Sequence, residues 1–272
     1  MKNRPMLITG CQRSGTTLLH LILGSHPEIH SIDEMEYSES KLYKYLYDTE
    51  FSPQVAFKIP VYAPFLDWIK KLLPELRVLW LVRNPRDVVA SMMATHLLLT
   101  GGASVPWPSH PLGGTREILH CTPALPSDVK ERIHPYLDRY QAIAKITPTE
   151  RRERDVIFVG ALCWKIKNEL LKSYDLIGIP FLIVCYEKLV TSPKEEISKI
   201  LKYLGLSWHD NVLKHNLLHK GILVGKTEAS RAIDTTSIGR WKNVFSVEEL
   251  HLIDELTADL AKGFSYKYEE TT

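Results

Sequence analysis

Short apolar runs alternate along most of the chain with longer segments of helical periodicity. Short, mainly apolar segments are typical of strands buried in a parallel sheet, and they cover residues 5–9, 54–60, 77–82 and 180–189. Apolar residues at helical spacing predict helices over residues 16–24, 65–76, 84–99, 155–174, 192–206 and 246–264. Strands and helices in this order predict an α/β protein with a central parallel sheet flanked by helices.

Two of the predicted helices begin at residues suited to that position. Asn84 can accept a backbone hydrogen bond as the cap of one helix, and Pro85 fits its first position because it lacks an N–H group. Ser246 is followed three residues later by Glu249, which predicts a capping box at the start of the other helix.

Residues 97–150 interrupt the alternation of strands and helices. They hold seven of the sixteen prolines of the chain together with two Gly-Gly pairs, and their periodicity is poor. A long irregular insertion in a compact domain is usually a lid, a binding loop or a disordered segment. We therefore expect one domain over residues 1–272, with a loop and helical insertion that acts as a lid and selects the substrate.

Composition and charge exclude several classes of protein. The 272 residues are 44% hydrophobic and 24% charged, as in ordinary globular chains, and a net charge of +2 does not indicate a nucleic-acid or membrane-surface partner. The four cysteines form no C-x-x-C pair, so neither a zinc site nor a disulfide framework is indicated. No apolar run reaches the roughly 18 residues of a membrane span, and the N-terminus lacks the apolar region of a signal peptide. We expect a cytoplasmic protein.

The first predicted strand leads into a loop, GCQRSGTT at residues 10–17, that nearly matches the P-loop pattern G-x-x-x-x-G-K-[ST]. Backbone N–H groups in such a strand-to-helix loop bind anions. Thr16 replaces the lysine that reaches the β- and γ-phosphates of a triphosphate, and Arg83 follows residues 77–82 where an NTPase commonly has a carboxylate for Mg²⁺. The sequence predicts a P-loop-like fold with a phosphate site that needs no metal; the alternative is a strand-to-helix turn without a ligand.

Three sequence blocks resemble one enzyme family. QRSGTTLL resembles the 5′-phosphosulfate loop of sulfotransferases that use 3′-phosphoadenosine-5′-phosphosulfate (PAPS), LVRNPRDVVAS resembles their 3′-phosphate motif, and GRWKNVFSVEEL resembles the segment that closes over the cofactor. The details resemble tyrosylprotein sulfotransferases and their bacterial relatives, although those tyrosyl enzymes are membrane-anchored and no anchor is predicted here. The resemblance implies transfer of a sulfuryl group from PAPS to an acceptor hydroxyl, with adenosine 3′,5′-bisphosphate (PAP) as the second product.

The resemblance also implies which residues bind the donor. Arg83 and Ser91 correspond to the positions that bind the 3′-phosphate, and arginine suits that role because its guanidinium matches phosphate oxygens bidentately. Tyr186 and Arg240 correspond to further cofactor-contacting positions. The alternatives are a surface ion pair between Arg83 and Asp87 and a core role for Tyr186. The loop residues expected to bind the 5′-phosphosulfate are Gln12, Arg13, Ser14, Gly15, Thr16 and Thr17.

Three residues are the catalytic candidates. Negative charge develops on the bridging oxygen as sulfuryl transfer proceeds, so we expect preformed cations to stabilise it, with Arg13 and Lys58 as candidates. The alternative for Lys58 is a strand-end lysine that reaches solvent. Glu34 corresponds to the glutamate base of the tyrosyl enzymes and would take the acceptor proton. Asp33 and Glu36 are its rivals, because a shift of one or two residues is invisible in the sequence. If Glu34 is the base, we expect both to be exposed and dispensable.

Two other functions remain open from the sequence. A P-loop kinase or NTPase would bind ATP with magnesium, and a catalytically inactive protein would bind a nucleotide without turnover. The joint presence of Arg13, Glu34, Lys58, Arg83 and Ser91 argues against the inactive alternative. The acceptor is a hydroxyl-bearing small molecule, sugar, lipid or tyrosine.

Overall fold

The chain forms two compact units in a computed structural model that describes residues 5–47, 54–73, 75–98, 104–106, 109, 114, 116–223 and 227–266. Unit 1 takes residues 1–82 and 174–235, and unit 2 takes residues 83–173 and 236–272. The first segment of unit 1 ends at Val82, which is also the last residue of the strand predicted over 77–82, and unit 2 begins at Arg83. That residues 1–272 act as one domain stays a prediction.

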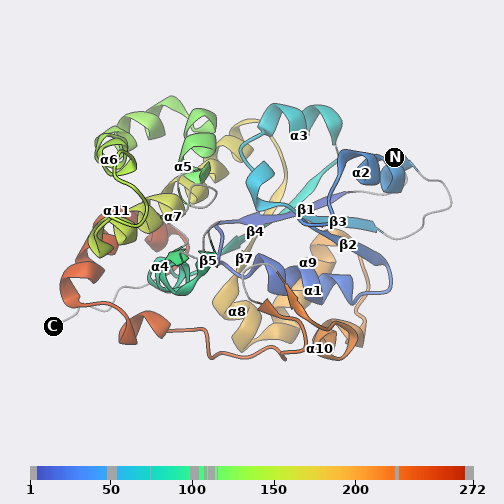
Figure 1. The fold of residues 1–272 in the computed structure, drawn as a ribbon. Coiled ribbons are helices and arrows are strands. Elements are labelled where there is room, and N and C mark those ends of the chain that lie inside the picture. Colours follow the sequence, from blue (N-terminus) through green and yellow to red (C-terminus); the bar gives the residue numbers. More distant parts are fainter. Residues whose placement is uncertain are drawn as a thin grey trace. The chain divides into compact units, whose positions relative to one another are not determined.

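Unit 1 is built on a parallel sheet of five strands in the order β2-β3-β1-β4-β7 (Figure 1). The strands are β1 (Met6–Gly10), β2 (Ile29–Asp33), β3 (Gln54–Lys58), β4 (Arg77–Val82) and β7 (Phe181–Cys185). All of β1 is buried, as is all of β4 after its first residue. Strands covered on both faces appear in a sequence as continuous apolar runs. The predicted central parallel sheet is confirmed.

Helices cover the sheet of unit 1 on both faces. Leu19 and Ile22 of one helix and Ile197 and Ile200 of another share an apolar core with β1, β4 and β7. Figure 1 shows α3 on the other side of the strands from α1 and α9. The helices of the unit are α1 (Thr16–Gly24), α2 (Glu39–Tyr47), α3 (Leu66–Leu72), α8 (Tyr186–Thr191), α9 (Pro193–Leu204) and α10 (His215–Leu218). Short 3-10 turns lie at Pro60–Tyr62 and Asp210–Leu213, and β8 (Ile222–Leu223) pairs with β9 (Thr227–Glu228).

The structure differs from the prediction at one missed strand and at several element ends. β2 was not predicted, because its sequence IHSID mixes polar and apolar residues at the edge of the sheet. The helix predicted over 84–99 ends at Ala94, where Thr95 turns the backbone to an extended conformation. The strand predicted over 180–189 ends at Cys185, and the next residue begins α8. The last two errors share a cause, since an apolar run does not mark where a strand and a helix adjoin.

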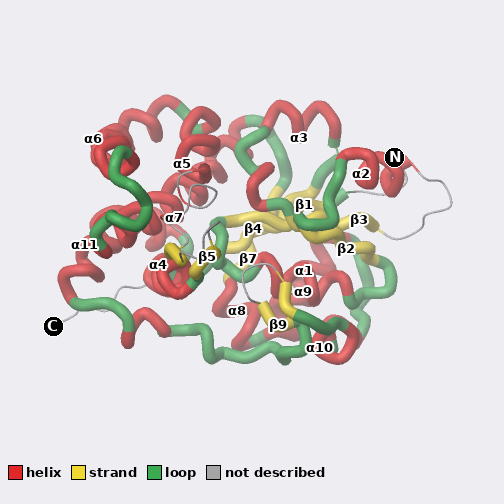
Figure 2. The backbone as a smooth tube through the Cα atoms, in the orientation of Figure 1, coloured by secondary structure: helices red, strands yellow, loops and turns green. Residues whose placement is uncertain are grey.

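Unit 2 is mainly helical (Figure 2). Its elements are α4 (Pro85–Ala94), β5 (His96–Leu98), β6 (Ser104–Pro106), α5 (Arg116–Cys121), a turn at Thr122–Ala124, α6 (Ser127–Ala144), α7 (Glu153–Leu176, which continues into unit 1 from Tyr174), a turn at Arg240–Asn243 and α11 (Val247–Gly263). Both predicted caps are confirmed. Asn84 accepts a hydrogen bond of 2.9 Å from the Arg86 N–H, and Ser246 and Glu249 form the capping box.

The described part of the 97–150 insertion is largely helical. Lys167 Nζ of α7 lies 3.1 Å from Glu117 Oε2 of α5, and Ser173 Oγ of α7 donates a hydrogen bond of 2.7 Å to the carbonyl of Ala124. These contacts hold the insertion on α7. Residues 99–103, 107–108, 110–113 and 115 lie outside the described residues, and the lid function stays a prediction.

Across the described residues, no helix combines the length and the apolar character needed to cross a membrane.

The position of Gly10 at the end of β1 tolerates no side chain. Its φ is +140°, and a Cβ atom there would lie 2.3 Å from the Leu81 carbonyl oxygen on β4. Gly178 also has a positive φ, +71°, but apart from its chain neighbours no atom lies within 4 Å of its would-be Cβ. We expect Gly178→Ala to lower the free energy of unfolding by about 1–2 kcal/mol and Gly10→Ala by about 4 kcal/mol or more, measured by urea denaturation. Equal losses would contradict a steric role for the β4 carbonyl.

Candidate active site

The loop between β1 and α1 is shaped by left-handed backbone conformations. Gly15 has φ +96°, and a Cβ atom at this position would lie 2.4 Å from Cδ2 of Tyr186. Position 15 therefore requires glycine for two reasons: the positive φ, and the Tyr186 ring that leaves no room for a Cβ atom. Arg13 has φ +71°, which costs a non-glycine residue about 1–3 kcal/mol and is found most often at functional sites.

The start of α1 provides groups that suit an anion. The helix has Gly15 as its N-cap, with no side-chain cap and no acidic residue in its first turn. Its first backbone N–H groups have no partner within the helix. Ser14 is fully buried, and its Oγ makes no hydrogen bond within the described structure. A buried hydroxyl without a partner is unfavourable by about 1–3 kcal/mol, so a ligand that accepts its hydrogen bond would stabilise this loop. The residues present fit a bound phosphate or sulfate group.

A buried lysine lies between two carboxylates at the carboxyl edge of the same sheet. Asp33 and Lys58, the last residues of β2 and β3, are opposite one another in the parallel register. Lys58 Nζ lies 2.9 Å from Asp33 Oδ2 and donates a hydrogen bond of 2.8 Å to Glu34 Oε1. Lys58 is 1% exposed, so the alternative of a lysine that reaches solvent is wrong. The structure thus brings a predicted cation and the predicted base into direct contact.

Exposure separates Glu34 from its two rivals. The Glu34 side chain is 24% exposed, whereas that of Asp33 is 8% exposed, and Asp33 Oδ1 accepts a hydrogen bond of 3.1 Å from the Met35 N–H. The expectation that Asp33 is exposed is wrong, because the strand register buries it beside Lys58. Glu36 is exposed, as expected. Of the two carboxylates on Lys58, Glu34 is the more exposed, and its role as base stays a prediction.

α1 adds a neutral histidine to this region. His20 is buried, and its Nδ1 lies 2.6 Å from the Ser31 Oγ on β2. Burial lowers the pKa of His20 to about 4; Lys58 and His219 act in the same direction, and Asp33 acts against them. His20 is therefore uncharged at neutral pH and contributes a hydrogen bond rather than a charge.

In unit 2, the segment that begins at Arg83 contacts the segment around residue 240. Arg83 and Ser237, which share a hydrogen bond, are 154 residues apart in the sequence. Arg83 is buried, and its Nη2 donates a hydrogen bond to the carbonyl of Ser237. The buried Asp87 accepts hydrogen bonds from the Gly239 N–H at 2.8 Å and from the Trp241 N–H at 3.3 Å. Because Arg83 and Asp87 are both buried, the alternative of a surface ion pair is wrong. Asp87 instead anchors the segment around residue 240.

A second set of contacts in unit 2 reinforces this anchor. Arg86 Nε donates a hydrogen bond of 2.9 Å to Asp254 Oδ1 on α11, and the Arg86 guanidinium lies 4.6 Å from the centroid of the Trp241 ring. The carbonyl of Arg83 accepts a hydrogen bond of 3.0 Å from Nε1 of the buried Trp164. The backbone of Arg83 and the start of α4 are thereby fixed.

The other cofactor-binding candidates have simpler surroundings. Ser91 is partly buried on α4, and its carbonyl accepts a hydrogen bond of 2.7 Å from the Thr95 hydroxyl. Arg240 is exposed, and its Nε donates to the carbonyl of Thr236 at 3.0 Å. Tyr186 is 7% exposed and packs on Gly15 in unit 1, so it has the core role that was its alternative; a contact with the cofactor stays a prediction.

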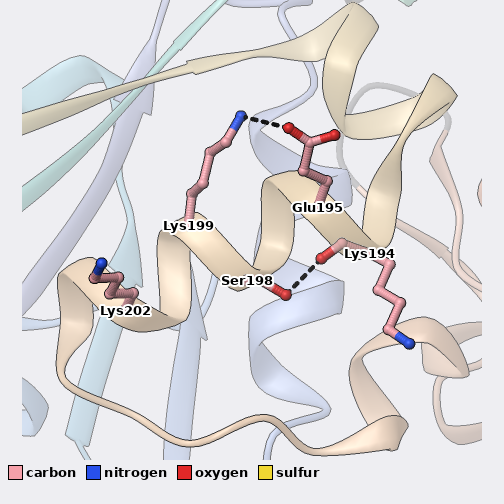
Figure 3. Close-up of a pocket in the computed structure, with 5 residues that line it drawn as sticks. All are labelled: Lys194, Glu195, Ser198, Lys199 and Lys202. Carbon is pink, nitrogen blue, oxygen red and sulfur yellow. Dashed lines mark hydrogen bonds and ion pairs between the residues drawn. The ribbon is translucent and has the colours of Figure 1, made fainter.

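A surface depression elsewhere in unit 1 contains none of these candidates. It lies along the exposed side of α9 (Figure 3), and its lining residues are Lys194, Glu195, Ser198, Lys199 and Lys202. Lys199 Nζ lies 3.2 Å from Glu195 Oε1, and both side chains are more than half exposed. Exposed ion pairs of this kind contribute little to stability, and the feature is a solvated helix face.

In comparisons with known proteins, a family model matches the part of the chain that holds the loop between β1 and α1. The model of the Sulfotransferase family matches residues 5–54, which include β1, the loop, α1 and β2. A relative from Caenorhabditis elegans, "Putative protein-tyrosine sulfotransferase", is 22% identical over 214 residues, covering 76% of this chain and 64% of the relative. The chain therefore spans just under two thirds of that relative's length.

Two solved structures share the fold. The sulfotransferase domain from the Synechococcus PCC 7002 olefin synthase has a TM-score of 0.58 at 16% identity, with 98% of this chain and 96% of that chain covered. Mouse sulfotransferase SULT7A1 complexed with PAP has a TM-score of 0.53 at 15% identity, with 97% and 89% covered. The chain is similar to the sulfotransferases. The predicted resemblance to that family and the predicted P-loop-like fold are confirmed.

For two residues, the structure indicates roles that the sequence analysis did not assign. Asp33 was considered as a rival base and proves to be a buried partner of Lys58. Asp87 was considered as a partner of Arg83 and proves to hold the backbone at residues 239–241. Asp87 lies in the first turn of α4, where a carboxylate is favoured. This position was the one feature of the sequence that indicated a structural role for Asp87.

We expect the buried His20 to make the protein less stable in acid. Its folded pKa lies below the ordinary value of 6.5, so the unfolded chain binds a proton first, and stability falls as the pH drops from above 6.5 toward 4. At pH 5 the loss is about 2 kcal/mol. Urea denaturation at pH 7.5 and pH 5 of wild type and His20→Gln tests this, because the variant loses that part of the pH dependence. His251→Gln, at an exposed histidine, serves as the control; an unchanged pH dependence in His20→Gln would refute the assignment.

Proposed function

We propose that the chain transfers a sulfuryl group from PAPS to a hydroxyl group of an acceptor. The observation that carries this proposal is the carboxyl edge of the unit 1 sheet. There the anion-binding loop follows β1, the buried Lys58 ends β3, and Glu34 follows β2, and these three strands are adjacent. The carboxyl ends of parallel strands are where ligands of α/β proteins bind. PAP bound to a mouse protein of the same fold supports PAPS as the donor.

The proposed reaction gives each group of this edge one task. The acceptor oxygen forms a bond to sulfur while the bond from sulfur to the bridging oxygen breaks, and its electron pair stays on the phosphate of PAP. The acceptor proton passes to Glu34. Arg13, Lys58 and the loop N–H groups stabilise the negative charge that develops on the leaving phosphate. The partly exposed Glu34 carboxylate supports its assignment as the base.

In unit 2, we assign Arg83, Ser91 and Arg240 to the 3′-phosphate of the donor. The fixed backbone of Arg83 and the Asp87 anchor support this assignment, because a preorganised cation binds phosphate without losing side-chain freedom. In unit 1, the loop residues Gln12 to Thr17 take the 5′-phosphosulfate, and the buried Ser14 hydroxyl supports this role.

For the acceptor, we propose an aryl hydroxyl of the kind found in tyrosine. The name of the C. elegans relative supports this choice, and so does a group of aromatic rings near the base in unit 1. Tyr37 follows Glu34 by three residues, and its ring centroid lies 5.3 Å from that of Tyr62 and 6.4 Å from that of Phe57. Phe65 extends the group and is 43% exposed. Aromatic faces of this kind pack against a phenol ring.

The donor assignment predicts a binding preference. We expect PAP to bind roughly tenfold or more tightly than ATP, a difference of about 1.4 kcal/mol or more, and to bind equally well with EDTA or magnesium. The reason is that Thr16 replaces the lysine of NTPases and that Arg83 rather than a carboxylate follows β4. Calorimetric titrations with PAP, ATP and AMP measure this, and AMP controls for the missing 3′-phosphate. Tight ATP binding that is lost on addition of EDTA would favour the kinase or NTPase alternative.

The base assignment predicts a specific loss of turnover. We expect Glu34→Gln to lower kcat by about a hundredfold or more, because the amide keeps the shape of the side chain but cannot take the proton. PAP affinity should stay the same. Glu36→Gln is the matched control, an exposed carboxylate two residues away that we expect to keep full activity. Transfer of radiolabelled sulfate from PAPS to a tyrosine peptide and to an alkyl alcohol gives the rates, and retained activity of Glu34→Gln on the alcohol would place the base elsewhere.

A further inference from the structure

The two carboxylates that share Lys58 differ in how they are held. Asp33 ends β2, directly opposite Lys58 in the strand register, so the backbone itself places it beside the ammonium. Its Oδ1 accepts the Met35 N–H at 3.1 Å and its carbonyl accepts the Glu36 N–H at 3.0 Å, which closes a turn after the strand. Glu34 lies beyond the strand and reaches the same ammonium with a longer, more exposed side chain. Asp33 is therefore the partner of Lys58 whose position is fixed by the backbone, and Glu34 is the partner whose charge can change.

We propose that Asp33 is a positioning residue for the transfer reaction: it is the permanent counter-charge of Lys58, so that the Glu34 carboxylate can accept the acceptor proton without leaving a buried ammonium uncompensated. This inference rests on the proposed function, in which Glu34 is the base. It assigns a role to a residue that the transfer reaction by itself does not require.

Charge balance gives the physical reason. A buried ammonium is strongly destabilised when its counter-charge is removed. If Glu34 were the single partner of Lys58, its protonation would create that state, and Lys58 would hold Glu34 in its ionised, weakly basic form. With Asp33 present, the three groups pass from a net charge of minus one to zero when Glu34 takes the proton. The proton comes from the acceptor hydroxyl as its oxygen bonds to sulfur, and the electron pair of the broken bond leaves with PAP.

The surrounding titratable groups do not perform this task. His20 on α1 faces Asp33 and Lys58, but burial lowers its pKa to about 4, and His219 acts in the same direction. Burial raises the pKa of Tyr37, which follows β2, so this phenol also stays neutral. Glu36 is exposed. Among these groups, Glu34 is the one whose charge the proposed reaction changes.

The test is the pH profile of kcat in Asp33→Asn. The substitution keeps the size of the side chain and the oxygen that accepts the Met35 N–H. It replaces the Oδ2 that faces Lys58 by an NH2 group, so the negative charge and one acceptor for the ammonium are lost together. Without this negative neighbour, Lys58 stabilises the ionised form of Glu34 more strongly, so the pKa of Glu34 falls. We expect the acidic limb of the profile to move about one pH unit or more lower and kcat at pH 7 to fall roughly tenfold, with PAP affinity unchanged.

Two variants control this experiment. Glu36→Gln removes a nearby exposed carboxylate and should leave both kcat and the acidic limb unchanged. Asp33→Glu keeps the charge and should restore the acidic limb to its wild-type position even where its geometry lowers kcat. If Asp33→Asn lowers kcat while the limb stays in place, Asp33 has a purely structural role and the inference is overturned.

A direct titration separates this inference from the proposed function. The Glu34 carboxyl can be followed by carbon-13 NMR in wild type and in Asp33→Asn, with Glu34→Gln to assign its signal. A lower pKa of Glu34 in Asp33→Asn supports the coupling whether or not PAPS turns over, and an unchanged pKa overturns it.

If Asp33→Asn does not fold, Asp33→Asn combined with Lys58→Met removes both opposite charges, and Glu34 should then titrate near its wild-type value; a strongly shifted value overturns the inference. Absence of sulfuryl transfer by wild type would instead reject the proposed function.

Discussion

The candidate site depends on one buried ammonium group. Lys58 ends a central strand, is almost fully removed from water, and has carboxylates at 2.8 and 2.9 Å. Such a charge is tolerated only where opposite charges reach it. The parallel register of β2 and β3 supplies one of them, since it sets Asp33 opposite Lys58. The edge strand β2 therefore does more than extend the sheet: its last residue, Asp33, and the residue that follows it, Glu34, are the carboxylates that allow a lysine to lie in the interior.

The loop after β1 depends on a different constraint, which is steric. Gly10 fits against the Leu81 carbonyl of β4, and Gly15 fits against the Tyr186 ring, so the chain can turn sharply between a buried strand and a helix. These close contacts fix the backbone that presents the start of α1. The positive φ of Arg13 and the buried Ser14 hydroxyl are unfavourable in the isolated protein. A rigid sheet behind the loop maintains both, and a bound anion would compensate for them.

In unit 2 a buried carboxylate has an analogous structural task. Asp87, in the first turn of α4, accepts two backbone N–H groups from residues 239 and 241. The Arg86 guanidinium also lies over the Trp241 ring of this segment and pairs with Asp254 on α11. The motif at Arg83 and the motif at Arg240 thus form one structural element of unit 2, although they are far apart in the sequence.

The sequence by itself determined the parallel sheet, the loop, the helix caps and the relationship to sulfotransferases. Each of these is encoded within a short segment: continuous apolar runs for β1 and β4, spaced glycines for the loop, and Asn84 or Ser246 for the caps. Only the tertiary structure decided that IHSID is a strand, that Asp33 rather than Glu36 shares Lys58 with Glu34, and that Asp87 holds residues 239–241. Local periodicity reports which face of an element is buried. Strand register and the partner of a buried charge depend on segments that meet only after folding, so neighbouring carboxylates with the same local pattern take different roles.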